Sequence, residues 1–132
     1  MKSFIDTILQ FKKPGKKLKE ECVFINEHFI VVKDIKMINK SENYIHYTAW
    51  FKYNRLSSLE DIDKNDIDLI KNIDFLVRKY INQIHSNECI KSFIHYPPSY
   101  YRLHIHFCNE KAMKDCEDNI REYYISDIIN TY

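Results

Sequence analysis

Basic and apolar side chains alternate along one short segment of the chain. The alternation sets Arg102, His104 and His106 against Leu103, Ile105 and Phe107. Because successive side chains of a β-strand point to opposite faces, the basic set lies on one face and the apolar set on the other. Three side chains that are cationic or nearly so do not stabilise one another when they lie side by side. We therefore expect an anion against the basic face, and a phosphate fits best.

His104 lies in the middle of the basic row and is the candidate nucleophile. A neutral imidazole can attack a phosphorus atom and form a phosphoramidate, which water then hydrolyses. The attack requires that the other ring nitrogen donate its proton to a backbone carbonyl, which sets the tautomer. It also requires a nearby cation or hydrogen-bond donor for the charge that develops around phosphorus.

Two other interpretations of these histidines stay open. The first is a zinc site, with the ligands His95, His104, His106 and Cys108. Arg102 on the same face counts against it, since a fixed positive charge would lie beside the cation. The second is a polar strand face whose histidines only form hydrogen bonds. Three of the six histidines of the chain lie near one hairpin, which disfavours this second interpretation.

The elements around this segment follow from the spacing of apolar residues. Steps of three and four residues predict a long helix over 64–85. A Ser58–Asp61 capping box is expected just before it. Strands are predicted over 22–25, 29–32, 44–53, 89–96 and 101–108, and further helices over 3–11 and, with a weaker period, 111–132. The short connection at 97–99 makes the last two strands antiparallel neighbours, which brings His95 toward the face of His104.

The overall composition limits the class of protein. With 132 residues, of which 45% are hydrophobic, the chain is expected to form one domain over 1–132. Its 20 basic and 19 acidic residues give a net charge of +1, so it lacks the basic excess of proteins that bind DNA by bulk electrostatics. A single glycine, Gly15, excludes the glycine-rich phosphate loops.

Location and thiol chemistry follow from what the sequence lacks. It has no stretch with the length and apolarity of a signal peptide or a membrane span, so we expect a cytoplasmic or nuclear protein without a membrane partner. No two of the four cysteines are two residues apart, and we expect free, mostly buried thiols. They are Cys22, Cys89, Cys108 and Cys116.

Residues 95–107, HYPPSYYRLHIHF, closely resemble the signature of a known family. The family is the scavenger mRNA decapping enzymes, a branch of the histidine triad superfamily, in which a His-Tyr-x-Pro-Ser-Tyr-Tyr segment leads into alternating histidines. The similarity extends upstream to residues 45–62, before the long helix, and to residues 32–36. It covers the chain from about residue 29 to residue 108.

The resemblance implies roles position by position. His104 matches the central histidine that these enzymes use as the catalytic nucleophile. Contacts to phosphate are implied for His95, Ser99, Tyr100, Arg102, His106 and Lys36. Contacts to the methylated guanine are implied for Asp34, as a carboxylate on the edge of the base, and for Phe4, as a stacking ring. No metal or cofactor is implied.

The fold and the activity are implied in the same way. The resemblance indicates an α+β histidine triad fold, in which one long helix packs on an antiparallel sheet, and a homodimer. The implied reaction is metal-independent hydrolysis of the 7-methylguanosine cap dinucleotide or a short capped RNA, releasing 7-methylguanosine monophosphate.

Two departures from the family pattern keep alternatives open. Arg102 stands at the position of the first triad histidine, and the separate N-terminal domain of these enzymes is not expected here. The alternatives are a catalytically silent module that binds caps or nucleotides, and a general histidine triad hydrolase of dinucleotides or phosphoramidates.

Overall fold

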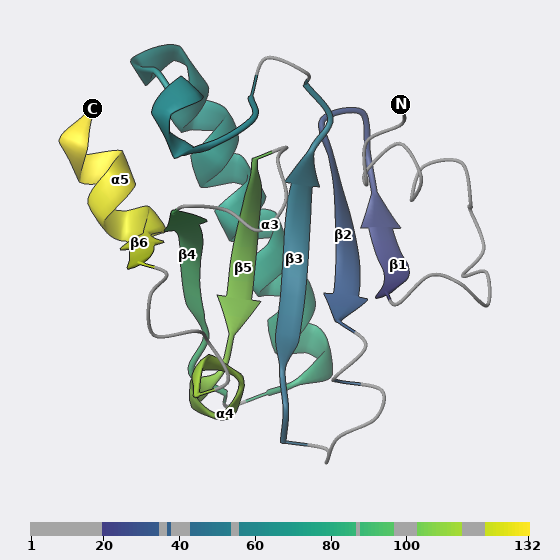
Figure 1. Ribbon diagram of the computed structural model, residues 1–132. Helices are drawn as coiled ribbons and strands as arrows, with labels where there is room; N and C mark the ends of the chain where they lie inside the picture. Colours follow the sequence, from purple (N-terminus) through teal and green to yellow (C-terminus); the bar gives the residue numbers. More distant parts are fainter. Residues whose placement is uncertain are drawn as a thin grey trace.

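The protein forms a six-stranded antiparallel sheet in the strand order β1-β2-β3-β5-β4-β6 (Figure 1). The computed structural model describes residues 20–34, 37, 43–53, 56–86, 88–96, 103–114 and 121–132. The strands are β1 (Glu20–Ile25), β2 (Phe29–Asp34), β3 (His46–Phe51), β4 (Lys91–Tyr96), β5 (His104–Cys108) and β6 (Arg121–Tyr124). The helices are α3 (Ile67–Ile84), α4 (Glu110–Met113) and α5 (Ile125–Thr131). This architecture confirms the predicted α+β class.

The helix α3 confirms the prediction made from apolar spacing for residues 64–85. A turn of 3-10 helix, Lys64–Asp66, leads into it, and the Asp63 carboxylate accepts a hydrogen bond from the Asn65 backbone at 2.7 Å. The expected Ser58–Asp61 capping box is also present in the short 3-10 turn that precedes it. The buried positions of α3 recur at steps of three and four residues, and they are Ile67, Ile70, Ile73, Val77 and Ile81.

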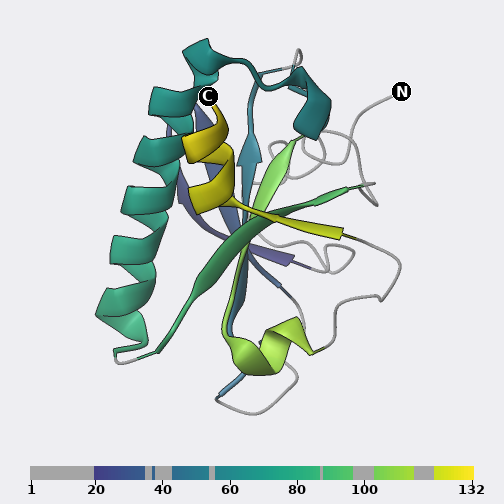
Figure 2. The same ribbon diagram turned by 90° about the vertical axis from the view of Figure 1, so that its left-hand side faces the viewer.

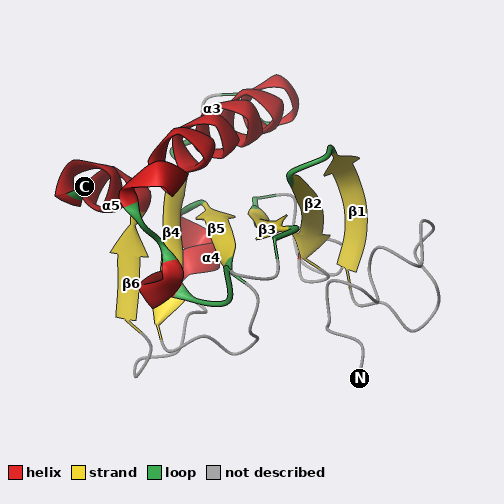
Figure 3. Cartoon of the chain, turned by 90° about the horizontal axis from the view of Figure 1, so that it is seen from above, coloured by secondary structure: helices red, strands yellow, loops and turns green. Residues whose placement is uncertain are grey.

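The main core lies between α3 and one face of the sheet (Figure 2). Leu103, Ile105 and Phe107 point into this core, as their alternation with the basic residues predicts. A fully buried aliphatic or aromatic side chain of this kind stabilises the fold by about 1.5–3 kcal/mol. The helix α5 lies beside α3 on the same side of the sheet (Figure 3). Two helices, rather than one, therefore cover this face.

The opposite face of the sheet is not covered by a layer of the described helices. Among the described helices, α3 and α5 lie on the other side, and α4 lies at one end of the sheet (Figures 1 and 3). A smaller apolar cluster of Ile30, Val32 and Trp50 lies on this opposite face. His104 and His106 belong to the same face, since Trp50 pairs directly with His104 and Thr48 with His106 across β3 and β5. We call this surface the histidine face.

Antiparallel pairing of β4 with β5 was predicted and is confirmed, with Phe93 opposite His106. The helix predicted over 111–132 is wrong in part. Residues Arg121–Tyr124 form the edge strand β6, which pairs with β4, because edge pairing satisfies the backbone and suits two adjacent tyrosines. The strand predicted over 44–53 is shorter, as β3 ends at Phe51.

The state of the cysteines can be compared with the expectation from the sequence. The described cysteines are free thiols, as predicted, but Cys89 is exposed because it lies in the connection before β4, so the expectation of buried thiols fails there. The helix predicted over 3–11 lies outside the described residues. Within the described parts of the chain, no helix has both the length and the apolarity needed to cross a membrane.

Candidate functional site

His104 lies at the start of β5 on the histidine face and is almost fully buried. Its imidazole stacks on the indole of Trp50, with ring centroids 3.9 Å apart and an angle of 20° between the planes. The stack follows from the register of the sheet, because Trp50 is the direct cross-strand partner of His104. Trp50 thus restricts the orientation of the candidate nucleophile.

His106 lies two residues further along β5 and is surrounded by rings. Its Nδ1 is 2.9 Å from Nε2 of His46 on β3. Phe93 on β4 stacks against it, with centroids 5.5 Å apart and an angle of 15° between the planes. Burial, followed by the nearby charges of His104, His46 and His95, holds the pKa of His106 well below its usual value. His106 is therefore neutral at pH 7.

His95 completes the cluster from β4. Its ring centroid lies 4.2 Å from that of His106. Burial, with a smaller contribution from the charge of His46, lowers the pKa of His95 from 6.5 to about 4. His95 and His106 are thus neutral near pH 7, whereas the sequence suggested a row of cationic or nearly cationic groups. Neutral imidazoles can act as nucleophiles, as proton acceptors or as single donors.

Two residues on neighbouring strands extend the cluster. Oδ2 of Asp34, at the end of β2, lies 3.4 Å from Nδ1 of His46 at the start of β3. The sequence analysis did not select His46. The only signal in the sequence is a histidine near the start of the strand predicted over 44–53, and its position beside His106 depends on how β3 and β5 pair.

The structure brings together four of the predicted site residues. His95, His104 and His106 lie within one cluster of rings, and Asp34 reaches that cluster through His46. The other predicted residues lie outside the described residues: Phe4, Lys36, Ser99, Tyr100 and Arg102. Their roles stay predictions.

The zinc interpretation can be examined from the positions of the possible ligands, all of which are described. Within the described parts of the chain, no group of three or more histidine, cysteine, aspartate or glutamate side chains is placed to hold a metal ion. Cys108 packs instead in a small apolar cluster with Phe93 and Ala112.

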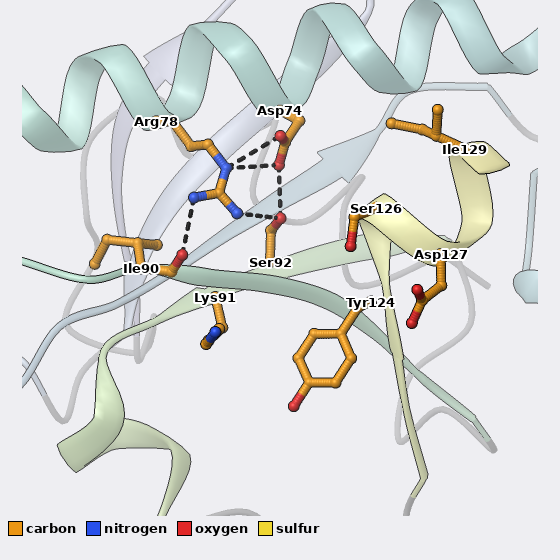
Figure 4. Close-up of a pocket in the computed structure, with 9 residues that line it drawn as sticks. All are labelled: Asp74, Arg78, Ile90, Lys91, Ser92, Tyr124, Ser126, Asp127 and Ile129. Carbon is orange, nitrogen blue, oxygen red and sulfur yellow. Dashed lines mark hydrogen bonds and ion pairs between the residues drawn. The ribbon is translucent and has the colours of Figure 1, made fainter.

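A cavity with a volume of about 490 Å³ lies between α3, β4 and α5 (Figure 4). The guanidinium of Arg78 on its wall binds Asp74 at 3.0 Å, the backbone oxygen of Ile90 at 2.8 Å and the hydroxyl of Ser92 at 2.7 Å (Figure 4). Because these internal groups engage each of its nitrogens, Arg78 ties α3 to β4. The network is structural and lies apart from the histidine face.

The fold and the site together define a class: an antiparallel sheet, covered by helices on one face, that presents a cluster of imidazoles on the other. Residues 8–122 match the family model described as "Scavenger mRNA decapping enzyme C-term binding". The chain belongs to this family. The resemblance stated from residues 95–107 is thereby confirmed.

Three curated relatives carry the name m7GpppX diphosphatase. The protein of Caenorhabditis elegans is 29% identical over 77% of this chain and 33% of its own length. That of Ascaris suum is 24% identical over 96% of this chain and 43% of its own length. That of Schizosaccharomyces pombe is 27% identical over 78% of this chain and 34% of its own length. The chain thus spans less than half the length of these relatives.

Proposed function

We propose that this domain hydrolyses the 7-methylguanosine cap dinucleotide, or a short capped RNA, and releases 7-methylguanosine monophosphate. The observation that supports this most is the position of His104. It lies buried on the histidine face against Trp50, beside two neutral histidines, in a chain of the decapping family. The name of the relatives, m7GpppX diphosphatase, agrees with the proposed substrate.

The reaction proceeds in two steps. A ring nitrogen of His104 attacks the phosphorus next to 7-methylguanosine, and the bond from that phosphorus to the bridging oxygen breaks. The remaining nucleotide leaves with the bridging oxygen and takes up a proton. Water then adds to the phosphorus and the phosphorus–nitrogen bond of the phosphoramidate breaks, which restores His104. No step requires a metal or a cofactor.

Cations and hydrogen-bond donors must stabilise the phosphate charge in both steps. We assign this role to Lys36, Arg102, Ser99 and Tyr100, with His95 as a neutral donor, on the resemblance to the family. Arg102 in place of the first triad histidine offers a guanidinium fork that can bind two phosphate oxygens. Phe4 and Asp34 are assigned to the methylated base on the same grounds.

The test is a product assay on purified protein. The wild type is incubated with cap dinucleotide and a chelator, and the products are separated by chromatography. We expect 7-methylguanosine monophosphate as a product, with unchanged rate on chelation. His104→Asn should lower the rate by about 10⁴-fold or more, because it removes the nucleophile. Its affinity for the cap should stay within a few fold.

His85→Asn is the matched control, since His85 binds Tyr47 on the helix side of the sheet. It should retain the wild-type rate. Substantial turnover by His104→Asn would refute the mechanism. Tight binding by the wild type without cleavage would indicate a silent cap-binding module. Faster cleavage of a diadenosine polyphosphate or a nucleoside phosphoramidate would indicate a general histidine triad hydrolase.

We also propose that the protein is a homodimer in the cytoplasm or nucleus. The sequence offers two surfaces too apolar to expose, the aromatic strand predicted over 44–53 and the long helix. In the structure the strand residues Tyr47, Trp50 and Phe51 are buried within the chain itself. The helix α3 is the better surface, because Phe75 on its outer side is 63% exposed.

A further inference from the structure

Three side chains from three neighbouring strands form a linear array on the histidine face. Oδ2 of Asp34 on β2 lies 3.4 Å from Nδ1 of His46 on β3. Nε2 of the same His46 ring lies 2.9 Å from Nδ1 of His106 on β5. The two nitrogens of His46 thus face two different partners, and His46 connects the carboxylate to His106.

The protonation of His46 sets the direction of the contact between the two rings. A carboxylate only accepts hydrogen bonds, so the single N–H of a neutral His46 is best placed on Nδ1, which faces Oδ2 of Asp34. In that state Nε2 of His46 is an acceptor, and the proton between the two rings belongs to Nδ1 of His106. His106 itself is neutral, because burial and the neighbouring histidines lower its pKa. Its Nε2 therefore carries a lone pair.

No donor from the described residues reaches this lone pair. Nε2 of His106 is buried, and within the described parts of the chain it has no hydrogen-bond partner. The described rings nearest to His106 belong to His95, at 4.2 Å, His104, at 4.9 Å, His46, at 5.2 Å, and Phe93, at 5.5 Å between centroids. A buried acceptor without a donor destabilises the site, so an incoming O–H group that donates to it is bound favourably.

We propose that Asp34 and His46 are positioning residues, which hold His106 with its proton on Nδ1 so that Nε2 accepts a hydrogen bond from an O–H group at the reaction site. This inference rests on the proposed function. It changes the role of His106 from a phosphate donor, which needs an N–H at that atom, to an acceptor. It also gives Asp34 a role within the cluster, separate from the methylated base.

Two O–H groups fit the reaction: a ribose hydroxyl of the substrate and the water of the second step. In the water case, the oxygen of water bonds to phosphorus and its proton moves to Nε2 of His106. The phosphorus–nitrogen bond breaks and its electron pair returns to His104. Asp34 and His46 stabilise the positive charge that forms on His106 in that step, as a carboxylate–histidine pair does for a general base.

The first experiment measures the tautomer directly. The protein is labelled with ¹⁵N in its imidazoles, and long-range ¹H–¹⁵N correlation spectra are recorded at about pH 7. The signals of His106 are assigned from the spectrum of His106→Gln. We expect a protonated Nδ1 and an unprotonated Nε2. A proton on Nε2 of His106 in the wild type would overturn the proposal.

The second experiment removes the connecting residue. His46→Phe deletes the acceptor for Nδ1 of His106 and should lower kcat or kcat/KM by about 10–100-fold, as losses of orienting partners do. His46→Gln offers a side-chain oxygen in place of the lost nitrogen and should recover most of the activity and the wild-type tautomer. A fall in kcat alone identifies water as the donor, whereas a rise in KM alone identifies a ribose hydroxyl.

Circular dichroism and the control His85→Phe separate this effect from loss of folding. If folded His46→Phe keeps full activity, or if His46→Gln is impaired as strongly, the positioning role is refuted. The two proposals fail in different ways. A wild type that cleaves no nucleotide refutes the proposed function, while the tautomer of His106 still decides whether the array exists.

Discussion

The stack of Trp50 on His104 should contribute measurably to stability and to the orientation of the nucleophile. The perturbation is a double-mutant cycle with Trp50→Leu, His104→Leu and the double variant. Each single change removes one ring from a stacked pair whose centroids are 3.9 Å apart. The cycle isolates the interaction between the rings, since losses that each variant suffers on its own cancel.

The expected magnitude follows from burial and geometry. Trp50 is 2% exposed and His104 is 7% exposed, so solvent competes little with the contact. A stacked aromatic pair contributes about 0.5–1.5 kcal/mol beyond the burial of its area. Truncating a buried tryptophan to alanine costs about 3–5 kcal/mol, and leucine retains more volume and costs less. A domain of typical stability, about 5–15 kcal/mol, therefore stays folded.

Urea unfolding followed by circular dichroism is the suitable assay, because Trp50 is the single tryptophan of the chain and its fluorescence is lost in the two variants that lack it. At a typical urea slope of about 1–3 kcal/mol per molar, 1 kcal/mol moves the midpoint by about 0.3–1 M. Trp50→Leu combined with His85→Leu is the control, since His85 lies on the helix side and binds Tyr47. That pair should be additive to within about 0.3–0.5 kcal/mol.

The same variants report on function. Trp50→Phe keeps an aromatic face for His104 and should retain more of the hydrolysis rate than Trp50→Leu. A coupling free energy below about 0.3 kcal/mol, which is within the error of additivity, would show that the stack contributes nothing. Equal rates for the two Trp50 variants would show that it does not orient His104.

Two further predictions concern acid and assembly. Because the pKa of His95 falls from 6.5 to about 4 on folding, the unfolded chain takes up a proton more readily. The free energy of unfolding should fall as the pH drops through this range. In His95→Gln, the urea midpoints measured at about pH 7, 5 and 4 should depend less on pH than in the wild type. An equal dependence on pH in the two proteins would contradict the assignment. For assembly, light scattering should give twice the chain mass of 16.1 kDa, and Phe75→Glu on α3 should shift it toward one chain. A wild type of single-chain mass would contradict the dimer.

Local sequence patterns were sufficient to predict much of the fold. The apolar period of three and four residues predicted α3, because a helix must bury one stripe of side chains. The alternation of Leu103, Ile105 and Phe107 with the histidines predicted which face of β5 packs. The signature over 95–107 also predicted the family that the comparison confirms.

Other elements depended on partners that are distant in the chain. The tyrosines of β6 repeat weakly at helical steps, yet pairing along β4 makes their segment a strand. The preference of this segment for a helix is small, and the backbone hydrogen bonds formed at the edge of the sheet outweigh that preference. The helix α5 begins only after that strand, so the predicted helix over 111–132 was too long.

The site shows the same division. The sequence by itself determined that His104 and His106 share a face of one strand, because side-chain alternation is a property of the extended backbone. Only the tertiary structure decided that Trp50 stacks on His104 and that His46 joins Asp34 to His106. The register of β2, β3 and β5 places those residues side by side, and a shift of one residue would turn each side chain to the opposite face. Burial in the folded chain is also what keeps His95 and His106 neutral.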